Sequence, residues 1–316
     1  MKLVVITGCL GLIGSHLTKK CLDLGWQVYG IDNITYAANQ YLIPFFEKYD
    51  NFTFTKADIA TLKYLPDCDY VINVAAESHV GNSIVESEDF IHTNVGGVKN
   101  LLDLIRKKQK NVDDLPIFLH FSTDEVYGDI TEGSHTELDI LNPSNPYSAS
   151  KACSDMLILA WSRTYKMKYV IVRPTNNYGA GQYPEKLIPI SVKMLQRGKK
   201  IKLHDEGEPS RNWLHADDTA SAIITIIESG NTNEIYNIAG GFEQKNKQTV
   251  KKIVQCYFGD ERDYKNYVDL GFKREGQDIR YSLNDSKLRA LGWEPKMNFD
   301  DEIQNIVKFY KNNFKW

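Results

Sequence analysis

The segment Thr7-Gly8-Cys9-Leu10-Gly11-Leu12-Ile13-Gly14 follows a short apolar run and precedes a stretch with helical spacing of apolar residues. Glycines in this context allow a tight turn, close approach of the backbone to a pyrophosphate, and close packing of helix on strand. The spacing is G-x-x-G-x-x-G, which departs from the G-x-G-x-x-G fingerprint of dinucleotide-binding folds. The strand before it and the helix after it are the context that such a site requires. We therefore predict a dinucleotide site here.

The second predicted strand ends at Asp32, 18 residues beyond Gly14. A carboxylate there accepts hydrogen bonds from an adenosine ribose and repels a 2′-phosphate, which favours NAD over NADP. The alternative is that Asp32 only caps the following turn. Asp58 and Ile59 close the third predicted strand, where they either flank the adenine or belong to a turn.

Short β-branched runs alternate with longer stretches of helical periodicity, the pattern of an α/β fold. We predict a Rossmann-type doubly wound parallel sheet with a smaller, discontinuous C-terminal substrate-binding domain. Strands are predicted at 3–7, 28–32, 52–56, 70–74, 117–122 and 169–173, and helices at 13–24, 88–108 and 148–165. A helix at 216–228 and a strand at 234–238 are expected to return to the sheet. The predicted domains are 1–175 plus about 211–240, and about 176–210 plus 241–316.

The composition excludes several classes of protein. The chain has 316 residues, with 38 basic and 41 acidic side chains and a formal net charge of -3. This balance lacks the Lys/Arg excess that nucleic-acid binding requires. No apolar run approaches the roughly 20 residues of a membrane span, and the histidines show no metal-ligand spacing. The five scattered cysteines, without a C-x-x-C pair, favour a reducing, cytoplasmic location.

Candidate catalytic residues follow the fifth predicted strand, in Ser122-Thr123-Asp124-Glu125-Val126-Tyr127-Gly128. Open α/β sheets bind ligands at this carboxyl edge. Tyr147 and Lys151 share one face of the next helix, so the ammonium is expected to lower the pKa of the phenol from about 10. The neighbouring Asp124 and Glu125 push each other's pKa values apart, leaving one acid and one base. The alternative is a solvated Asp-Glu pair in a loop.

Together these motifs resemble the extended short-chain dehydrogenase/reductase family, and above all the nucleotide-sugar 4,6-dehydratases of the dTDP-glucose type. The resemblance covers nearly the whole chain. The segments that carry it are T-G-C-L-G-L-I-G at 7–14, D-N-I-T-Y-A-A-N at 32–39, A-A-E-S-H-V at 75–80, S-T-D-E-V-Y-G at 122–128, Y-S-A-S-K at 147–151, N-N-Y-G-A-G-Q-Y-P-E-K-L-I-P at 176–189 and R-N-W-L at 211–214.

The resemblance implies a hydro-lyase that forms a 4-keto-6-deoxyhexose for deoxysugar biosynthesis, such as the rhamnose pathway. Tyr147, supported by Lys151, would take the proton of the hexose 4-hydroxyl while a hydride passes from C4 to tightly bound NAD. Thr123 would hydrogen-bond the same oxygen. Glu125 would remove the C5 proton, and protonated Asp124 would donate to the departing 6-hydroxyl. Hydride then returns to C6 and a proton to C5, which regenerates NAD in each turnover.

The same resemblance implies the binding residues, assigns the first domain to NAD and the second to the nucleotide sugar, and includes no metal. The NAD-binding residues would be Gly8, Gly11, Leu12, Ile13, Gly14, Asp32, Asn33, Thr35, Asp58, Ile59, Val74, Ala75, Ala76, Ser78, Thr93, Tyr147, Lys151 and Asn177. The substrate-binding residues would be Ser78, Thr123, Asn176, Glu185, Lys186, Leu187, Lys202, His204, Arg211, Asn246, Arg274 and Gln277. A homodimer is implied, formed by helices 88–108 and 148–165.

Three alternatives stay open. Related UDP-glucuronate decarboxylases resemble S-T-S-E-V-Y-G, with Ser in place of Asp124, and the 4-epimerases lack the Glu as well. A non-catalytic NAD-binding sensor or scaffold would have lost a catalytic residue, and none is lost. The family's Pro-Ile-Tyr beside the nucleobase reads Lys202-Leu203-His204 here, so dTDP-glucose and UDP-glucose both remain candidate substrates.

Overall fold

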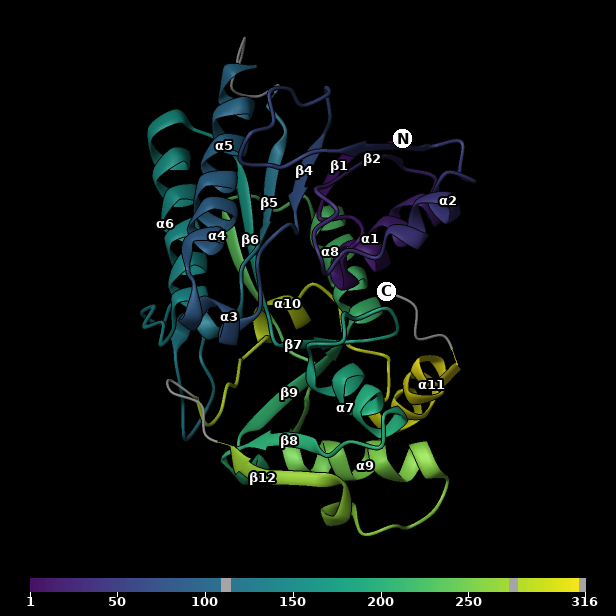
Figure 1. The fold of residues 1–316 in the computed structure, drawn as a ribbon. Helices are drawn as coiled ribbons and strands as arrows, with labels where there is room; N and C mark the ends of the chain where they lie inside the picture. The colour runs from purple at the N-terminus through teal and green to yellow at the C-terminus, as the bar shows by residue number, and fades with distance from the viewer. Residues whose placement is uncertain (109–114, 273–277, 313–316) are drawn as a thin grey trace.

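The computed structural model describes residues 1–108, 115–272 and 278–312. Their largest sheet has seven strands, all parallel, in the order β10-β6-β5-β4-β1-β2-β3 (Figure 1). The strands are β1 (Leu3–Thr7), β2 (Gln27–Asp32), β3 (Phe52–Lys56), β4 (Tyr70–Asn73), β5 (Ile117–Phe121), β6 (Tyr169–Pro174) and β10 (Glu234–Ile238). The order reverses between β1 and β4, and open α/β sheets bind ligands at the carboxyl ends of strands at such a point.

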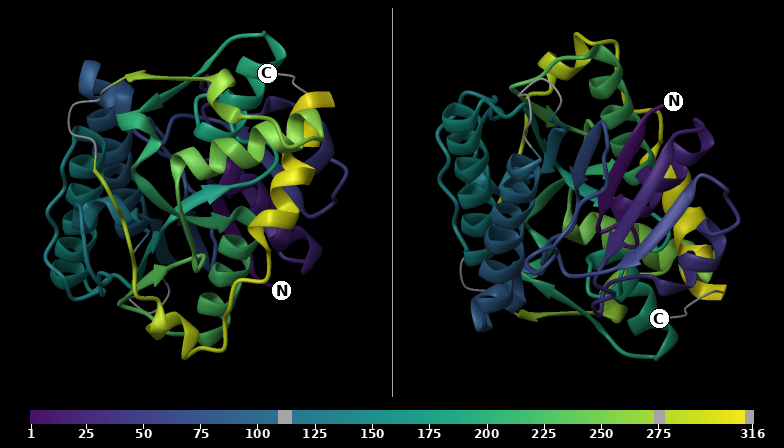
Figure 2. Two further views of the ribbon diagram at one scale, coloured as in Figure 1. Left: turned by 90° about the horizontal axis from the view of Figure 1, so that it is seen from below. Right: turned by 90° about the horizontal axis from the view of Figure 1, so that it is seen from above.

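Helices cover both faces of this sheet. Val4 and Ile6 of β1 pack into one hydrophobic cluster, whereas Val5 packs into another on the opposite face. The first cluster includes residues of α1 (Leu12–Asp23) and α8 (Ala216–Ser229), and the second includes residues of α5 (Val98–Lys107) and α6 (Pro146–Tyr165). Seen from above, α5 and α6 lie together on one side of the strands (Figure 2). Burial on both faces accounts for the near-continuously apolar strands and confirms the predicted doubly wound fold.

A second group of elements packs around its own hydrophobic cluster below the sheet (Figures 1 and 2). It contains a three-stranded sheet of β7 (Asn176–Tyr178), β9 (Ser210–His215) and β11 (Phe242–Lys245), and a two-stranded sheet of β8 (Ile201–His204) and β12 (Val268–Phe272). Its helices are α7 (Leu187–Gln196), α9 (Asn246–Phe258) and α11 (Phe299–Asn312). Between its parts the chain returns to the main sheet, because α8 packs on α1 and β10 pairs with β6.

The predicted helix at 88–108 is not continuous. The chain forms α4 (Glu88–Phe90), a π-helical segment η2 (Ile91–Gly97), and then α5. Within the π-helical segment the buried Asn94 side chain accepts the N–H of Glu77 at 2.9 Å and donates to Ser150 Oγ at 2.9 Å. Such bulges are frequent at functional sites. Here the bulge turns Asn94 inward, where it joins the loop after β4 to α6.

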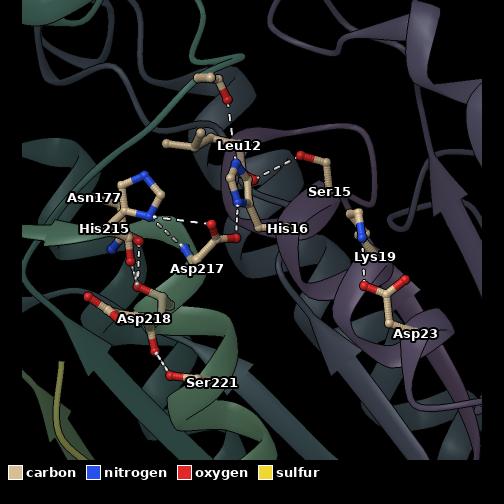
Figure 3. A network of polar contacts seen from close by, with 12 residues as sticks. Leu12, Ser15, His16, Lys19, Asp23, Asn177, His215, Asp217, Asp218 and Ser221 are labelled. Carbon is tan, nitrogen blue, oxygen red and sulfur yellow. Dashed lines mark hydrogen bonds and ion pairs between the residues drawn. The ribbon is translucent and has the colours of Figure 1, made fainter. Parts of the chain in front are cut away.

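Helix α1 is joined to the start of α8 by a network of polar contacts (Figure 3). His16 Nδ1 lies 2.5 Å from Asp217 Oδ1, and the N–H of Asp217 donates to His215 Nδ1 at 3.2 Å. Two residues further along α8, the Thr219 hydroxyl donates to Asn177 Oδ1 at 2.5 Å. These contacts hold the two helices and strand β7 in one arrangement and fix the side chain of Asn177.

The remaining short elements connect these layers. The α-helices among them are α2 (Ile43–Phe46) before β3, α3 (Val80–Val85) after β4 and α10 (Ser286–Arg289) beside β10. The 3₁₀ helices are η1 (Gln40–Leu42), η4 (Asp124–Tyr127), η5 (Asp205–Gly207) and η6 (Tyr264–Tyr267).

Candidate active site

A cavity of about 320 Å³ runs along the carboxyl edge of the main sheet. Small-molecule sites have volumes of about 300–1,000 Å³. Every residue predicted to bind NAD and all five predicted catalytic residues line this cavity. The fold therefore brings together motifs that lie more than a hundred residues apart in the sequence.

The three glycines of the first turn differ in what surrounds them. Gly8 has a φ of 68°, and a Cβ atom there would lie 2.7 Å from the Ala75 backbone. A Cβ atom on Gly14 would lie 1.9 Å from the carbonyl oxygen of Gly8, whereas one on Gly11 would meet only that oxygen, at 3.4 Å. Packing thus requires Gly8 and Gly14. At Gly11, which lines the cavity where α1 begins, the open space suits a pyrophosphate at a helix N-terminus.

This difference predicts opposite outcomes for two alanine substitutions. Gly14→Ala is expected to destabilise the fold by about 1–3 kcal/mol or more, because the new methyl group overlaps the Gly8 carbonyl. Gly11→Ala is expected to keep the stability of the parent chain but to weaken NAD binding at least tenfold. Urea unfolding and NAD titration followed by fluorescence measure the two effects. Equal loss of stability in both variants would contradict this assignment.

The Asp32 carboxylate both caps the turn and lines the cavity. It is 8% exposed, and its oxygens accept the N–H groups of Leu10 at 3.0 Å and Ile34 at 2.8 Å. Burial raises the pKa of Asp32, and these two backbone hydrogen bonds act in the opposite direction. Each carboxylate oxygen has more than one acceptor site, so one N–H on each still allows bonds to ribose hydroxyls. Asp58 is placed similarly, accepting the N–H of Ala60 at 2.8 Å at the cavity wall.

The Asp124 carboxyl group is buried and only partly hydrogen-bonded. One carboxylate oxygen, Oδ1, accepts the Thr123 hydroxyl at 3.1 Å, while Oδ2 is buried without a hydrogen-bond partner among the described residues. Burial, followed by the negative charge of Glu125, raises the pKa of Asp124 to about 7. A carboxyl group with this pKa can hold a proton at neutral pH, and its neighbour Glu125 is less buried.

The expectation that Lys151 lowers the pKa of Tyr147 is wrong for this geometry. Burial raises the pKa of Tyr147, and the charges of Glu125 and Asp124 raise it further, although hydrogen bonding with Thr123 opposes them. Sequence spacing placed the two side chains on one helical face but could not include burial. The pKa of Lys151 is itself lowered to about 8, by burial above all.

A buried polar chain lies behind Lys151. Its Nζ is 3.4 Å from His120 Nε2, and His120 Nδ1 is 3.0 Å from Asn73 Nδ2. The Thr7 hydroxyl then donates to Asn73 Oδ1 at 2.6 Å. Burial lowers the pKa of His120 well below its usual value, so this ring is neutral. The chain joins Lys151 to the end of β1, where the glycine turn begins.

A buried ion pair supports the same helix. Asp155 lies one turn after Lys151 and accepts the Arg173 guanidinium at 2.9 Å and the Ser122 hydroxyl at 3.1 Å. Breaking a buried pair of this kind by removing one partner is strongly destabilising. The pair fixes α6, and with it Tyr147 and Lys151, against β5 and β6.

The predicted substrate residues fall into two groups. Ser78, Thr123, Asn176, Glu185 and Lys186 line the cavity, and Asn176 Oδ1 is buried without a hydrogen-bond partner in the part of the chain that the structure describes. The other predicted substrate residues that the structure describes do not line the cavity. They are Leu187, Lys202, His204, Arg211 and Asn246. Arg274 and Gln277 lie outside the described residues.

Hydrogen bonds to the backbone explain why Arg211 does not line the cavity. Its guanidinium donates to the carbonyl oxygens of Ser210 at 2.7 Å and Asp278 at 3.2 Å, and it lies 4.9 Å from the centre of the Tyr281 ring. Backbone carbonyls thus already occupy donors that were expected to meet phosphate. Lys202 and His204 sit on β8, beside Phe272 of β12.

Several lining residues were not predicted, although most adjoin a quoted motif. Six of them lie inside such motifs, so their sequence positions could have revealed them: Ala37, Ala38, Glu77, Ser122, Gln182 and Tyr183. The unpredicted lining residues are Ile31, Ala37, Ala38, Ala57, Glu77, Phe121, Ser122, Pro174, Thr175, Gln182 and Tyr183. Tyr281, which contacts Glu125, and Asp278, which accepts the Tyr281 hydroxyl, come from a distant segment and carried no local signal.

Residues 1–108, 115–272 and 278–312 contain neither a membrane-spanning helix nor a metal-ligand cluster. None of the helices there combines the length and apolarity that crossing a membrane requires. Among the same residues, no three His, Cys, Asp or Glu side chains are grouped as a metal site.

Comparison with known proteins gives consistent matches. The family model described as GDP-mannose 4,6 dehydratase matches residues 5–306. The chain is 38% identical to the dTDP-glucose 4,6-dehydratase of Haemophilus influenzae, over 98% of each chain. It is 36% identical to the low-salt glycan biosynthesis protein Agl12 of Haloferax volcanii, over 97% of this chain and 98% of the relative. Among solved structures, DesIV of Streptomyces venezuelae, a dTDP-glucose 4,6-dehydratase with NAD and TYD bound, superposes with a TM-score of 0.90 at 35% identity, covering 98% of this chain and 97% of that one.

Proposed function

This chain belongs to the GDP-mannose 4,6 dehydratase family within the short-chain dehydrogenases/reductases, and from this premise we propose that it is an NAD-dependent nucleotide-sugar 4,6-dehydratase. The reaction removes water from a nucleoside-diphosphate glucose and gives the 4-keto-6-deoxyglucose nucleotide. The named relatives favour dTDP-glucose as the substrate, with UDP-glucose as the alternative.

The observation that carries this proposal is the state of Asp124. It lines the cavity beside Glu125 and Tyr147, its Oδ2 atom is buried and unpartnered among the described residues, and its pKa is raised to about 7. An elimination needs an acid for the departing hydroxyl, which a 4-epimerase does not. The corresponding motif of the related decarboxylases has Ser at this position. A non-catalytic NAD sensor has no need for a carboxyl group in this state.

The residues of the cavity wall suit the cofactor and the first proton transfer. NAD, when bound, accepts a hydride from the sugar and returns it. The glycine turn and the start of α1 would hold its pyrophosphate, and Asp32 would hold its ribose. Tyr147 would take the proton of the 4-hydroxyl. Protonation of Asp124 assists this step, because it removes one of the charges that raise the pKa of Tyr147. With a pKa of about 8, Lys151 retains its ammonium charge at neutral pH.

Glu125 and Asp124 would divide the elimination between them. Oxidation at C4 makes the neighbouring C5 hydrogen acidic, and Glu125 removes it as the base. Asp124 donates its proton to the 6-hydroxyl, which leaves as water. Two adjacent carboxyl groups with different pKa values are the arrangement that allows one acid and one base at the same pH.

The experiment that tests this function offers dTDP-glucose, UDP-glucose and, for comparison, UDP-glucuronate separately to the protein loaded with NAD. The expected product is lighter than its substrate by one water, as measured by mass spectrometry. An isomer of unchanged mass would favour the epimerase alternative, and loss of carbon dioxide from UDP-glucuronate the decarboxylase alternative. Turnover of none of these nucleotides, with NAD still bound, would favour a sensor or scaffold.

We also propose a binding role for each domain, a cellular location and a biosynthetic use of the product. The main sheet and its helices, about 1–175 plus 211–240, would bind NAD, and about 176–210 plus 241–316 would bind the nucleotide sugar. A cytoplasmic location is supported by the five cysteines, all of which are free. The 4-keto product would feed deoxysugar biosynthesis, such as the rhamnose pathway.

A homodimer is proposed through α6 and the neighbouring helices. Four small or apolar side chains, Ala149, Cys153, Met156 and Ala160, are exposed on α6 at intervals of three or four residues. Ile91 in the adjacent π-helical segment is 52% exposed. An exposed apolar stripe at this spacing supports packing against another helix.

The dimer predicts a mass of twice 36.1 kDa in light scattering. Met156→Glu is expected to shift the protein toward monomer, because it places a charge in an apolar contact. Tyr41→Glu, at a 58% exposed position near α2 on the other side of the sheet, is the matched control and should stay dimeric (Figure 1). A monomeric mass for the unmodified chain would overturn the dimer.

A further inference from the structure

Two side chains from the segment before α10 lie behind the proposed base. Tyr281 is 2% exposed, and its hydroxyl is 3.4 Å from Glu125 Oε2 and is hydrogen-bonded to Asp278 Oδ2. The Ser144 hydroxyl donates to the same oxygen of Asp278. Glu125 is thus contacted by a phenol that is 156 residues away in the sequence.

The backbone around Tyr281 is firmly held. The Arg280 guanidinium donates to both carboxylate oxygens of Glu243, at 2.7 and 3.0 Å, and its N–H donates to Asp129 at 2.7 Å. On the other side, the carbonyl of Ser282 accepts the N–H of His135 at 2.9 Å. These contacts fix the position of the phenol relative to the catalytic edge.

The Tyr281 hydroxyl has a single proton to donate, which determines whether it donates to Glu125 or accepts from it. The Tyr281 hydroxyl has one proton but two carboxylates within reach, and an ionised carboxylate can only accept. The contact to Asp278 is the shorter one, so the proton lies there and the phenol oxygen presents lone pairs to Glu125. Burial, followed by the charges of Glu125 and Asp278, raises the pKa of Tyr281 well above its usual value, which keeps the phenol protonated.

We propose that Tyr281, oriented by Asp278, is a positioning residue for Glu125 that accepts a hydrogen bond from its carboxyl group once that group has taken the C5 proton. This inference rests on the proposed function. The C5–H bond breaks and the Glu125 O–H bond forms, while the electron pair left on the sugar expels the 6-hydroxyl, which leaves as water with the proton of Asp124. The proton on Glu125 then lies between its own oxygen and Tyr281, whose own proton stays with Asp278.

A second contact on the same oxygen has the opposite effect. Asn145 Nδ2 donates to Glu125 Oε2 at 3.4 Å, which favours the ionised carboxylate. Tyr281 favours the protonated form, so the two neighbours have opposite effects on the proton affinity of Glu125. This suits a carboxyl group that takes a proton from C5 and later gives one back. Among the described residues, Asp124 and Tyr147 also interact electrostatically with Glu125, and the Arg211 guanidinium lies over the Tyr281 ring.

Tyr281→Phe removes the hydroxyl oxygen and keeps the ring. We expect water release to slow about tenfold, while C4 oxidation, read as the burst of reduced cofactor, stays within twofold of the parent. The acidic limb of the kcat–pH profile should move to lower pH by about one unit, a tenfold change in the proton affinity of the base. The sign follows because the protonated form of Glu125 loses its acceptor, so the base remains ionised to lower pH.

Tyr64→Phe is the matched control, because it removes the same hydroxyl from a tyrosine that is 67% exposed and does not line the cavity. Its acidic limb should stay within a few tenths of a unit of the parent. Two results for Tyr281→Phe would show that Tyr281 is only structural and would overturn the inference. One is a slower reaction at every pH with no shift of the acidic limb of the kcat–pH profile. The other is a loss of C4 oxidation as large as the loss of water release. The parent chain is assayed beside the variants. Failure of the parent to release water overturns the proposed function and this inference together, whereas parental water release with an unmoved limb overturns the inference alone.

Discussion

Asp124→Asn is expected to slow the release of water by about 10²–10⁴-fold, the range for loss of a general acid. The amide keeps the shape of the side chain but has no proton to give to the departing hydroxyl. Oxidation at C4 does not need that proton, so the variant should accumulate reduced cofactor at 340 nm on mixing with the nucleotide sugar. Stopped-flow absorbance and mass spectrometry of the product measure the two steps separately.

The pH dependence of the parent provides a second test of the same role. Asp124 must be protonated to act, and burial raises its pKa to about 7. Water release should therefore fall as the pH rises through about 7, and Asp124→Asn should lose this dependence. Asp67→Asn makes the same change at a fully exposed carboxylate and should leave both steps unaltered. An Asp124→Asn enzyme with parental turnover would remove the acid role.

Tyr147→Phe is expected to stop the reaction one step earlier. Without the phenol, no group takes the proton of the 4-hydroxyl, and C4 oxidation should slow by about 10²–10⁴-fold. The loss should appear in the burst of reduced cofactor itself, so this variant accumulates none, in contrast to Asp124→Asn. The same stopped-flow experiment distinguishes them.

Tyr64→Phe is the matched control, since Tyr64 is 67% exposed and does not line the cavity. It should behave as the parent chain does. If Tyr147→Phe accumulated reduced cofactor to the parental level, the base at C4 would have to be another residue.

Much of the fold follows from local sequence patterns. Strands β1 and β3 and the start of α6 lie at or within two residues of their predicted positions, because apolar runs and caps act over a few residues. The exception is the predicted helix at 88–108. Its π-helical segment depends on Asn94 reaching Glu77 and Ser150, which are distant in sequence.

The sequence by itself determined the fold class, the glycine turn, the cofactor edge and the residues on the predicted NAD side of the cavity, because strand periodicity and motif spacing are local properties. Only the tertiary structure decided the protonation of those residues. Burial raises the pKa of both Asp124 and Tyr147, and in the case of Tyr147 this reverses the effect expected from the spacing of Lys151. The tertiary structure also placed the Arg211 guanidinium against backbone carbonyls and the Tyr281 hydroxyl against Glu125. Proton affinity depends on solvent exclusion and on neighbouring charges, and the folded chain alone sets both.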